Sequence, residues 1–146
     1  MSTIVVIHPE SCESVELTTT ATGLDLFGND RGIVAMKVNG HLQDLQRELA
    51  DGDEVEPVLA NSDEGLAIIR HSTAHVTAQA LQHLFVDAKL GIGPPITDGF
   101  YYDFAISPLT PDDLKAIEKR MGQIVREKQR FVRREVSDEE AREELA

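Results

Sequence analysis

The sequence predicts an α+β fold in two parts, and three patterns support that prediction. Residues 1–60 contain short β-branched runs separated by turn signals, which predict a small sheet. A long helical pattern follows, in which Arg70 is the only charged residue from Ile68 to Val86 when histidine is counted as neutral. From residue 62 onward the expected order is helix, strand, strand, helix, strand, helix, which is an α+β pattern.

The first part predicts a small sheet with one helix. Strands are expected at residues 3–8, 14–18, 33–38 and 55–59, with a short return strand at 42–45 and a helix at 20–27. Asn39-Gly40 is the strongest hairpin signal, because both central residues of a type I′ turn need a positive φ. This ββα then ββ order is that of the ubiquitin-like β-grasp fold, which we expect over residues 1–61.

A long helix is expected to open the second domain, residues 62–146. Asn61 is the predicted N-cap, and Glu64 would complete a capping box. The pattern continues to about Val86, with an apolar stripe at helical spacing: Leu66, Ile69, Thr73, Val76, Ala80 and Leu84. At about 100° per residue, the opposite side carries His71, His75, Ala78 and Gln82. The histidines therefore lie off the apolar stripe.

Strands and helices are expected to alternate in the rest of the second domain. A short strand at 89–92 and a glycine- and proline-rich loop precede an aromatic strand at 100–104, with Phe100, Tyr102 and Phe104 on one face. Thr110 and Pro111 predict the start of a helix. Its apolar face would comprise Leu114, Ile117, Met121, Ile124 and Val125. A strand at 131–136 and a short acidic helix capped by Ser137 and Glu140 are expected to follow.

Charge is distributed unevenly along the chain. The net charge is −12 over 146 residues, and residues 1–60 hold eleven acidic side chains against three basic ones. Residues 115–134 reverse this balance, with eight basic side chains against two acidic ones. A net acidic protein does not bind nucleic acid through bulk charge. The basic segment is thus where RNA phosphates would contact the chain, although a solvated helix face explains the same pattern.

Other compositional features favour a cytoplasmic globular protein. Hydrophobic residues make up 41% and charged residues 27%, both ordinary values. No apolar run approaches the roughly 20 residues of a membrane span, and the first residues lack the features of a signal peptide. The single cysteine, Cys12, excludes an internal disulfide framework and fits a reducing compartment.

The His71 and His75 pair is the strongest candidate for chemistry. Imidazoles one helical turn apart can share a metal, or can bind a substrate and its attacking water. No complete zinc ligand set accompanies them, and HExxH is absent, so a metalloprotease is not supported. Two structural, hydrogen-bonded histidines remain the alternative. For Tyr102 the alternatives are a place in the same cleft or core packing between Phe100 and Phe104.

Three segments resemble a known family. RHSTAH at residues 70–75, AKLGIGPPI at 88–96 and DGFYYDF at 98–104 resemble the editing domain of bacterial threonyl-tRNA synthetases. KVNG at residues 37–40 is similar to that family's TGS domain, a β-grasp module. These segments are most similar to those of actinobacterial members of the family. The family's later Cys-x-x-x-His segment and its class II core do not occur in these residues, so the chain resembles an amino-terminal fragment.

The resemblance implies a function and partners. The parent would be a cytoplasmic, homodimeric ligase that joins threonine to its tRNA using ATP and Mg²⁺, with zinc in its catalytic core. His71, His75 and Tyr102 would line part of a site that hydrolyses tRNA mischarged with serine. None of these residues is assigned as a metal ligand. Two other interpretations stay open: a non-catalytic TGS-type module that binds RNA or protein, and a stand-alone aminoacyl-tRNA hydrolase.

Overall fold

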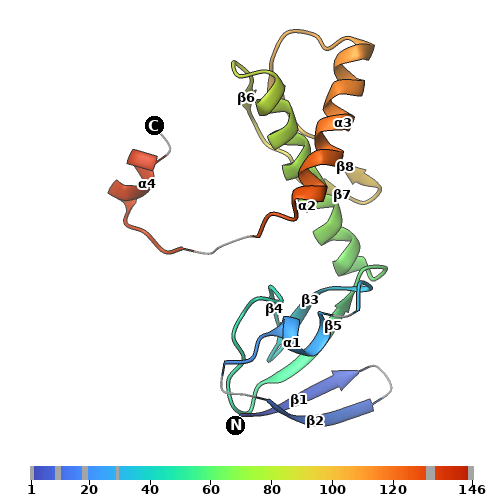
Figure 1. The fold of residues 1–146 in the computed structure, drawn as a ribbon, viewed down its shortest axis with the longest axis vertical. Helices are drawn as coiled ribbons and strands as arrows, with labels where there is room; N and C mark the ends of the chain where they lie inside the picture. The colour runs from blue at the N-terminus through green and yellow to red at the C-terminus, as the bar shows by residue number, and fades with distance from the viewer. Residues whose placement is uncertain (1, 9–10, 18–19, 29, 131–133, 145–146) are drawn as a thin grey trace.

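A five-stranded mixed sheet and a pair of long helices form the framework of the protein, which confirms the predicted α+β class (Figure 1). The computed structural model describes residues 2–8, 11–17, 20–28, 30–130 and 134–144. The sheet contains β1 (Ser2–His8), β2 (Ser11–Leu17), β3 (Ile33–Val38), β4 (His41–Gln43) and β5 (Glu54–Leu59), with α1 (Gly23–Phe27) between β2 and β3. Each element lies near its predicted position.

The sheet has the strand order β2-β1-β5-β3-β4. Strands β1 and β5 are parallel neighbours at its centre, while β1 pairs with β2 and β3 pairs with β4 as antiparallel hairpins. The second hairpin turns at Asn39 and Gly40, whose φ angles of 52° and 78° confirm the predicted turn with two positive φ values.

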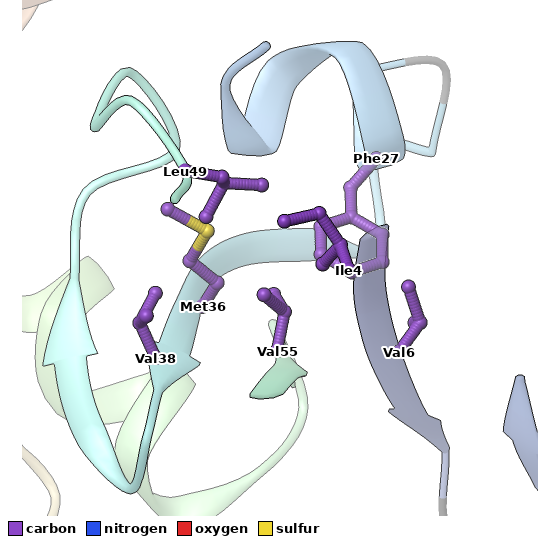
Figure 2. Packing of buried hydrophobic residues seen from close by; sticks show 7 residues of the cluster. All are labelled: Ile4, Val6, Phe27, Met36, Val38, Leu49 and Val55. Carbon is purple, nitrogen blue, oxygen red and sulfur yellow. The ribbon is translucent and has the colours of Figure 1, made fainter. Parts of the chain in front are cut away.

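The core of the first part lies between this sheet and the segments that cover it (Figure 2). Burying each large apolar side chain contributes about 1.5–3 kcal/mol relative to leaving it exposed. Figure 2 shows α1 placing Phe27 beside Ile4 of β1, while Leu49 lies over Met36 of β3. The buried cluster consists of Ile4, Val6, Phe27, Met36, Val38, Leu49 and Val55.

Helix α2 (Asp63–Leu84) begins one residue later than its predicted cap implies. The N-cap is Ser62, whose hydroxyl accepts a hydrogen bond from the Gly65 N–H at 3.1 Å and donates one to the Leu59 carbonyl at 2.7 Å. The predicted Asn61 cap is therefore wrong. Serine caps as well as asparagine, and Ser62 also reaches the last residue of β5. A Cβ on Gly65 would collide with that same Leu59 carbonyl, so only glycine lets the helix start this close to the sheet.

The predicted apolar stripe of α2 is only partly correct. Ala80 is buried, but Ile69 and Leu84 remain 40% and 42% exposed. Instead, Ala74 and Ala78 are buried, although Ala78 was predicted on the histidine side. The predicted stripe assumed one packing face, whereas the helix packs against α3 and also against the small hairpin described next. Alanine is well suited to such close contacts.

Short two-residue strands replace the continuous strands predicted for residues 89–104. Strand β6 (Lys89–Leu90) pairs with β9 (Phe104–Ala105), and β7 (Pro95–Ile96) pairs with β8 (Gly99–Phe100). The predicted strand at 100–104 is thus interrupted at residues 101–103. Its alternation nevertheless holds, because Phe100, Tyr102 and Phe104 are half-buried while Tyr101 is exposed.

Helix α3 (Pro111–Glu127) runs along α2 and completes the second core (Figure 1). Its predicted N-terminus is confirmed: Thr110 caps the helix and forms a capping box with Asp113. Ile117 and Ile124 are buried against Ala80, Leu81 and Ala88, but Leu114 and Val125, predicted on the same face, are 56% and 64% exposed.

The last described element is α4 (Asp138–Glu144), whose predicted Ser137–Glu140 cap is confirmed. The strand predicted at 131–136 is not found: residues 131–133 lie outside the described residues, and 134–136 are not in a strand. Across the parts of the chain that the structure describes, no helix combines the length and apolar character needed to cross a membrane.

Candidate functional site

The two histidines of α2 contact each other directly. His71 and His75 face one another through their Nε2 atoms at 3.0 Å, with ring centroids 4.7 Å apart and ring planes at 29°. A hydrogen bond needs one donor and one acceptor, so the accepting imidazole is neutral and holds a lone pair on Nε2. Both side chains are exposed. The predicted position off the packing stripe is confirmed for this pair.

A cavity of about 290 Å³ lies beside His75, between α2 and the end of α3. Ser72 and Gln79, one turn before and one turn after His75, line its α2 side. Gln79 donates a hydrogen bond to Gln129 at 3.1 Å, and this bond joins the α2 side of the cavity to the segment after α3. The cavity is lined by Ser72, His75, Val76, Gln79, Ile124, Val125, Lys128, Gln129 and Arg130.

Within the described residues, the histidine pair offers two imidazoles for hydrogen bonding or for metal ligation. Within the residues that the structure describes, no three His, Cys, Asp or Glu side chains gather closely enough to hold a metal ion. Structural zinc needs four ligands and catalytic zinc three, so two imidazoles do not complete a site. A neutral imidazole Nε2 at a cavity can instead accept a proton from water, which is the role of a general base.

Tyr102 lies on the segment that joins β8 and β9. Its ring stacks on Phe104 with centroids 4.5 Å apart and planes at 11°. A Cβ on Gly93 would collide with the Tyr102 ring, so this glycine provides room for the phenol ring. Backbone bonds between Gly91 and Asp103, and between Asp103 and Ile92, fix the register around it. The described contacts of Tyr102 are thus with Phe104 and Gly93, and the described ring contact of the histidines is with each other.

Part of the basic segment is engaged in contacts within the chain. Arg120 donates a hydrogen bond to Nδ1 of His83 at 3.0 Å, and this bond links α3 to α2. Arg120 also pairs with Glu127 of α3 at 3.1 Å. Arg134 pairs with Glu144 of α4 at 2.7 Å. Arg133 lies outside the described residues.

Helical spacing alone could have predicted part of the cavity, but not all of it. Ser72, His75 and Gln79 follow one another at three- and four-residue spacing, which places them on one side of α2. Lys128 and Arg130 belong to the basic segment in the sequence, but no pattern indicates that they face His75. Their position depends on Lys128, which ends α3 in the left-handed conformation with φ 50° and ψ 45°.

Comparison with known proteins identifies relatives along the whole chain. The chain is 60% identical to the threonine–tRNA ligase of Cutibacterium acnes over 148 aligned residues, which cover 100% of the chain and 22% of that protein. It is 58% identical to the ligase of Streptomyces avermitilis, covering 100% of the chain and 23% of the relative. For Thermobifida fusca the identity is 58% over 92% of the chain. A search against protein-family models found no match.

The matched relatives are named threonine–tRNA ligases, which are aminoacyl-tRNA ligases. Along its whole length, the chain matches the amino-terminal portion of these threonine–tRNA ligases. It spans about a fifth of the length of the curated relatives it matches. The predicted resemblance to actinobacterial members is thereby confirmed.

Proposed function

We propose that this chain contributes to proofreading within a ligase that joins threonine to its tRNA. The sheet order β2-β1-β5-β3-β4 supports a β-grasp domain of the TGS type over residues 1–61. Residues 62–146, built on α2, would then form the first part of the editing domain. ATP, Mg²⁺ and zinc would serve the synthetic reaction in the remaining length of the parent, which we propose to be a cytoplasmic homodimer.

A second site is needed because threonine and serine differ by a single methyl group. One methyl provides only about 1–3 kcal/mol of discrimination, or roughly 10–200-fold. A pocket that holds threonine also admits the smaller serine. Accuracy therefore requires a site that hydrolyses seryl-tRNA and denies room to the methyl of threonine.

The observation that carries this proposal is the Nε2 to Nε2 contact of His71 and His75 beside an open cavity. Ester hydrolysis needs an oriented water molecule and a group that accepts its proton as the water attacks the carbonyl carbon. The imidazole that accepts the hydrogen bond has a free lone pair once a water inserts between the rings. The other imidazole donates, and so can hold a hydroxyl or carbonyl oxygen of the ester. Tyr102 is proposed as a further substrate-binding residue.

The test removes one imidazole from a full-length ligase that contains this chain. His75→Ala is expected to leave the rate of threonylation nearly intact while seryl-tRNA clearance falls roughly 10²–10⁴-fold, the usual contribution of a general base. The measurement is the decay of radiolabelled seryl-tRNA in a single-turnover assay. His41→Ala is the matched control, since His41 is an exposed histidine of β4 in the sheet. Unchanged serine clearance in His75→Ala would refute the proposed site.

A further inference from the structure

We propose that Gln79 is a further substrate-binding residue of the cavity beside His75, and that its amide oxygen accepts a hydrogen bond from a hydroxyl group of the bound aminoacyl ester. Gln129 and Glu127 act as positioning residues, which keep that oxygen free for the ligand. This inference rests on the proposed function, because the ester is the substrate named there. The contact involves residues outside the histidine pair.

Gln79 lies on the same side of α2 as the histidine pair, one turn further along the helix. Four-residue spacing places His71, His75, Gln79 and His83 in one polar row. Gln79 is half-buried and lines the cavity together with His75. At about 1.5 Å of rise per residue, the two residues are about 6 Å apart along the helix. A ligand held at His75 is therefore within reach of the Gln79 side chain.

The direction of each hydrogen bond to Gln79 follows from Glu127, the last residue of α3. An ionised carboxylate only accepts hydrogen bonds, so the Gln129 atom 2.8 Å from Oε2 of Glu127 is the amide nitrogen. The oxygen of the Gln129 amide then faces Gln79, and it also only accepts. Gln79 must donate to it through its own amide nitrogen, at 3.1 Å. The amide oxygen of Gln79 is thereby left as an acceptor.

Arg120 holds the carboxylate from which this order starts. Nη1 of Arg120 donates to Oε1 of Glu127 at 3.1 Å, so both carboxylate oxygens are occupied by donors. The same guanidinium donates from Nε to Nδ1 of His83 at 3.0 Å, and from Nη1 to Gln123 at 3.1 Å. A guanidinium is always charged and only donates, so these bonds cannot reverse. The hydrogen bonds thus run from His83 on α2, through α3, and back to Gln79 on α2.

The amide oxygen of Gln79 is the atom that a ligand would use. Within the part of the chain that the structure describes, this oxygen has no hydrogen-bond partner. A ligand that fills the cavity displaces the water that hydrates the oxygen. A buried acceptor without a donor is costly, so a ligand that supplies a donor at this point binds better than one that does not.

Charge in the cavity favours a hydroxyl over an ammonium group as this donor. Lys128 and Arg130 line the same cavity, and both are cations that repel a protonated amine. An aminoacyl ester offers two neutral hydroxyls, one on the serine side chain and one on the ribose beside the ester bond. Threonine carries the same side-chain hydroxyl as serine. The contact therefore selects esters that bear a hydroxyl, and it leaves the exclusion of the threonine methyl to other groups.

The experiment measures, by calorimetry, how a full-length ligase that contains this chain binds the stable amide analogues of seryl-adenosine and alanyl-adenosine. Threonyl sulfamoyl-adenosine fills the synthetic site beforehand. Gln79→Met removes the oxygen but keeps the length of the side chain. It should lower the affinity for the seryl analogue roughly 3–10-fold, the usual effect of losing one neutral hydrogen bond. The matched control is Gln82→Met, which should leave the affinity unchanged, because Gln82 is exposed on the same helix and is not among the residues that line the cavity.

A double-mutant cycle tests the positioning role of Glu127. Glu127→Gln allows the Gln129 amide to turn over, so that Gln79 can present its nitrogen to the ligand, and the seryl analogue should bind more weakly. In the Gln79→Met background, the same change should have no further effect. A merely structural role of Glu127 would weaken binding in both backgrounds. Glu118→Gln is the control, since Glu118 is an exposed glutamate of α3. The threonylation rate of each variant reports whether the enzyme is folded.

The alanyl analogue distinguishes the two sources of the hydroxyl. A loss of affinity confined to the seryl analogue assigns the bond to the serine side chain, whereas an equal loss for both analogues assigns it to the ribose. Unchanged affinity for both in Gln79→Met, or an equal loss in Gln82→Met, would overturn the proposal.

The proposed hydrolytic function fails separately from this contact. If His75→Ala leaves serine clearance unchanged while Gln79→Met weakens binding, the hydrolytic role of His75 is wrong and the contact at Gln79 stands. If His75→Ala abolishes clearance while Gln79→Met binds both analogues normally, the hydrolytic role stands and the contact is wrong.

Discussion

At the scale of single residues, Asp53 shows how one buried carboxylate organises three chain segments. Oδ1 accepts a hydrogen bond from the Asn39 side chain at 2.8 Å, and Oδ2 accepts one from the Ala50 N–H at 2.9 Å. Arg47 pairs with the same Oδ2 at 3.3 Å. Burial alone would raise the pKa of Asp53, but these donors together hold the pKa below its ordinary value of 3.8.

Replacing Asp53 by Ala should therefore cost stability in a pH-dependent way. A carboxyl group whose pKa is lowered by folding stabilises the protein fully above its unfolded pKa of about 4, and this contribution is lost as the pH falls through the lower folded value. At pH 7 the free energy of unfolding should drop by about 1–3 kcal/mol, since three donors lose their acceptor. The difference from the parent chain should shrink below about pH 4.

Urea titrations at pH 7 and pH 3 measure this difference. Asp98→Ala is the control, because Asp98 is an exposed aspartate in the turn between β7 and β8. A destabilisation by Asp53→Ala that is equal at both pH values would show that the carboxylate charge contributes nothing, and that the loss comes from packing alone.

At the scale of elements, the junction between β5 and α2 depends on one hydroxyl group. Ser62→Ala should lower the free energy of unfolding by about 1 kcal/mol, the usual effect of removing an N-cap. Asn61→Ala should change it by less than about 0.5 kcal/mol, as for an ordinary surface substitution. Chemical denaturation of the two variants side by side provides a direct comparison. A larger loss of unfolding free energy in Asn61→Ala than in Ser62→Ala would show that Asn61 is the cap.

Sequence patterns predicted the elements well where the signal is local. The Asn39-Gly40 turn, the Thr110 cap and the Ser137 cap each depend on neighbouring residues, and each is confirmed. The choice between Asn61 and Ser62 was not local, because Ser62 also bonds to the end of β5. The burial of Ala74 and Ala78 likewise depends on which elements pack against α2.

The candidate site was predictable to the same extent. Spacing alone placed His71 and His75 together, and their 3.0 Å contact follows from a single helical turn. The cations at the cavity were not predictable, because a left-handed residue at the end of α3 directs them toward His75. The role of Tyr102 stays a prediction, since its described contacts are with Phe104 and Gly93.

At the scale of the whole molecule, the sheet and the helix pair meet at an apolar groove. Val34 of β3, Ile68 and Ile69 of α2, and Met121 and Val125 of α3 line a groove of about 420 Å³. An ion pair of 2.8 Å between Lys37 and Glu64 also joins the sheet to α2. Glu64 raises the pKa of Lys37 through this hydrogen bond.

The isolated 146-residue chain should use this groove to self-associate. Exposed apolar surface of this kind favours association in water. The average mass in sedimentation equilibrium should rise with protein concentration, and Val125→Lys should suppress the rise by placing a charge at the groove. Val86→Lys is the matched control, since Val86 is 88% exposed and does not line the groove. A concentration-independent monomer would contradict this prediction.

The direct start of α2 from β5 has a mechanical consequence. Ser62, Gly65 and the Lys37–Glu64 pair brace the first turn of the helix against the sheet. His71 lies about 12 Å from the base of the helix, at about 1.5 Å of rise per residue. A tilt of the sheet by about 10° that α2 follows would displace His71 by about 2 Å and His75 by about 3 Å. A molecule that binds the sheet and tilts it would therefore also move the two histidines.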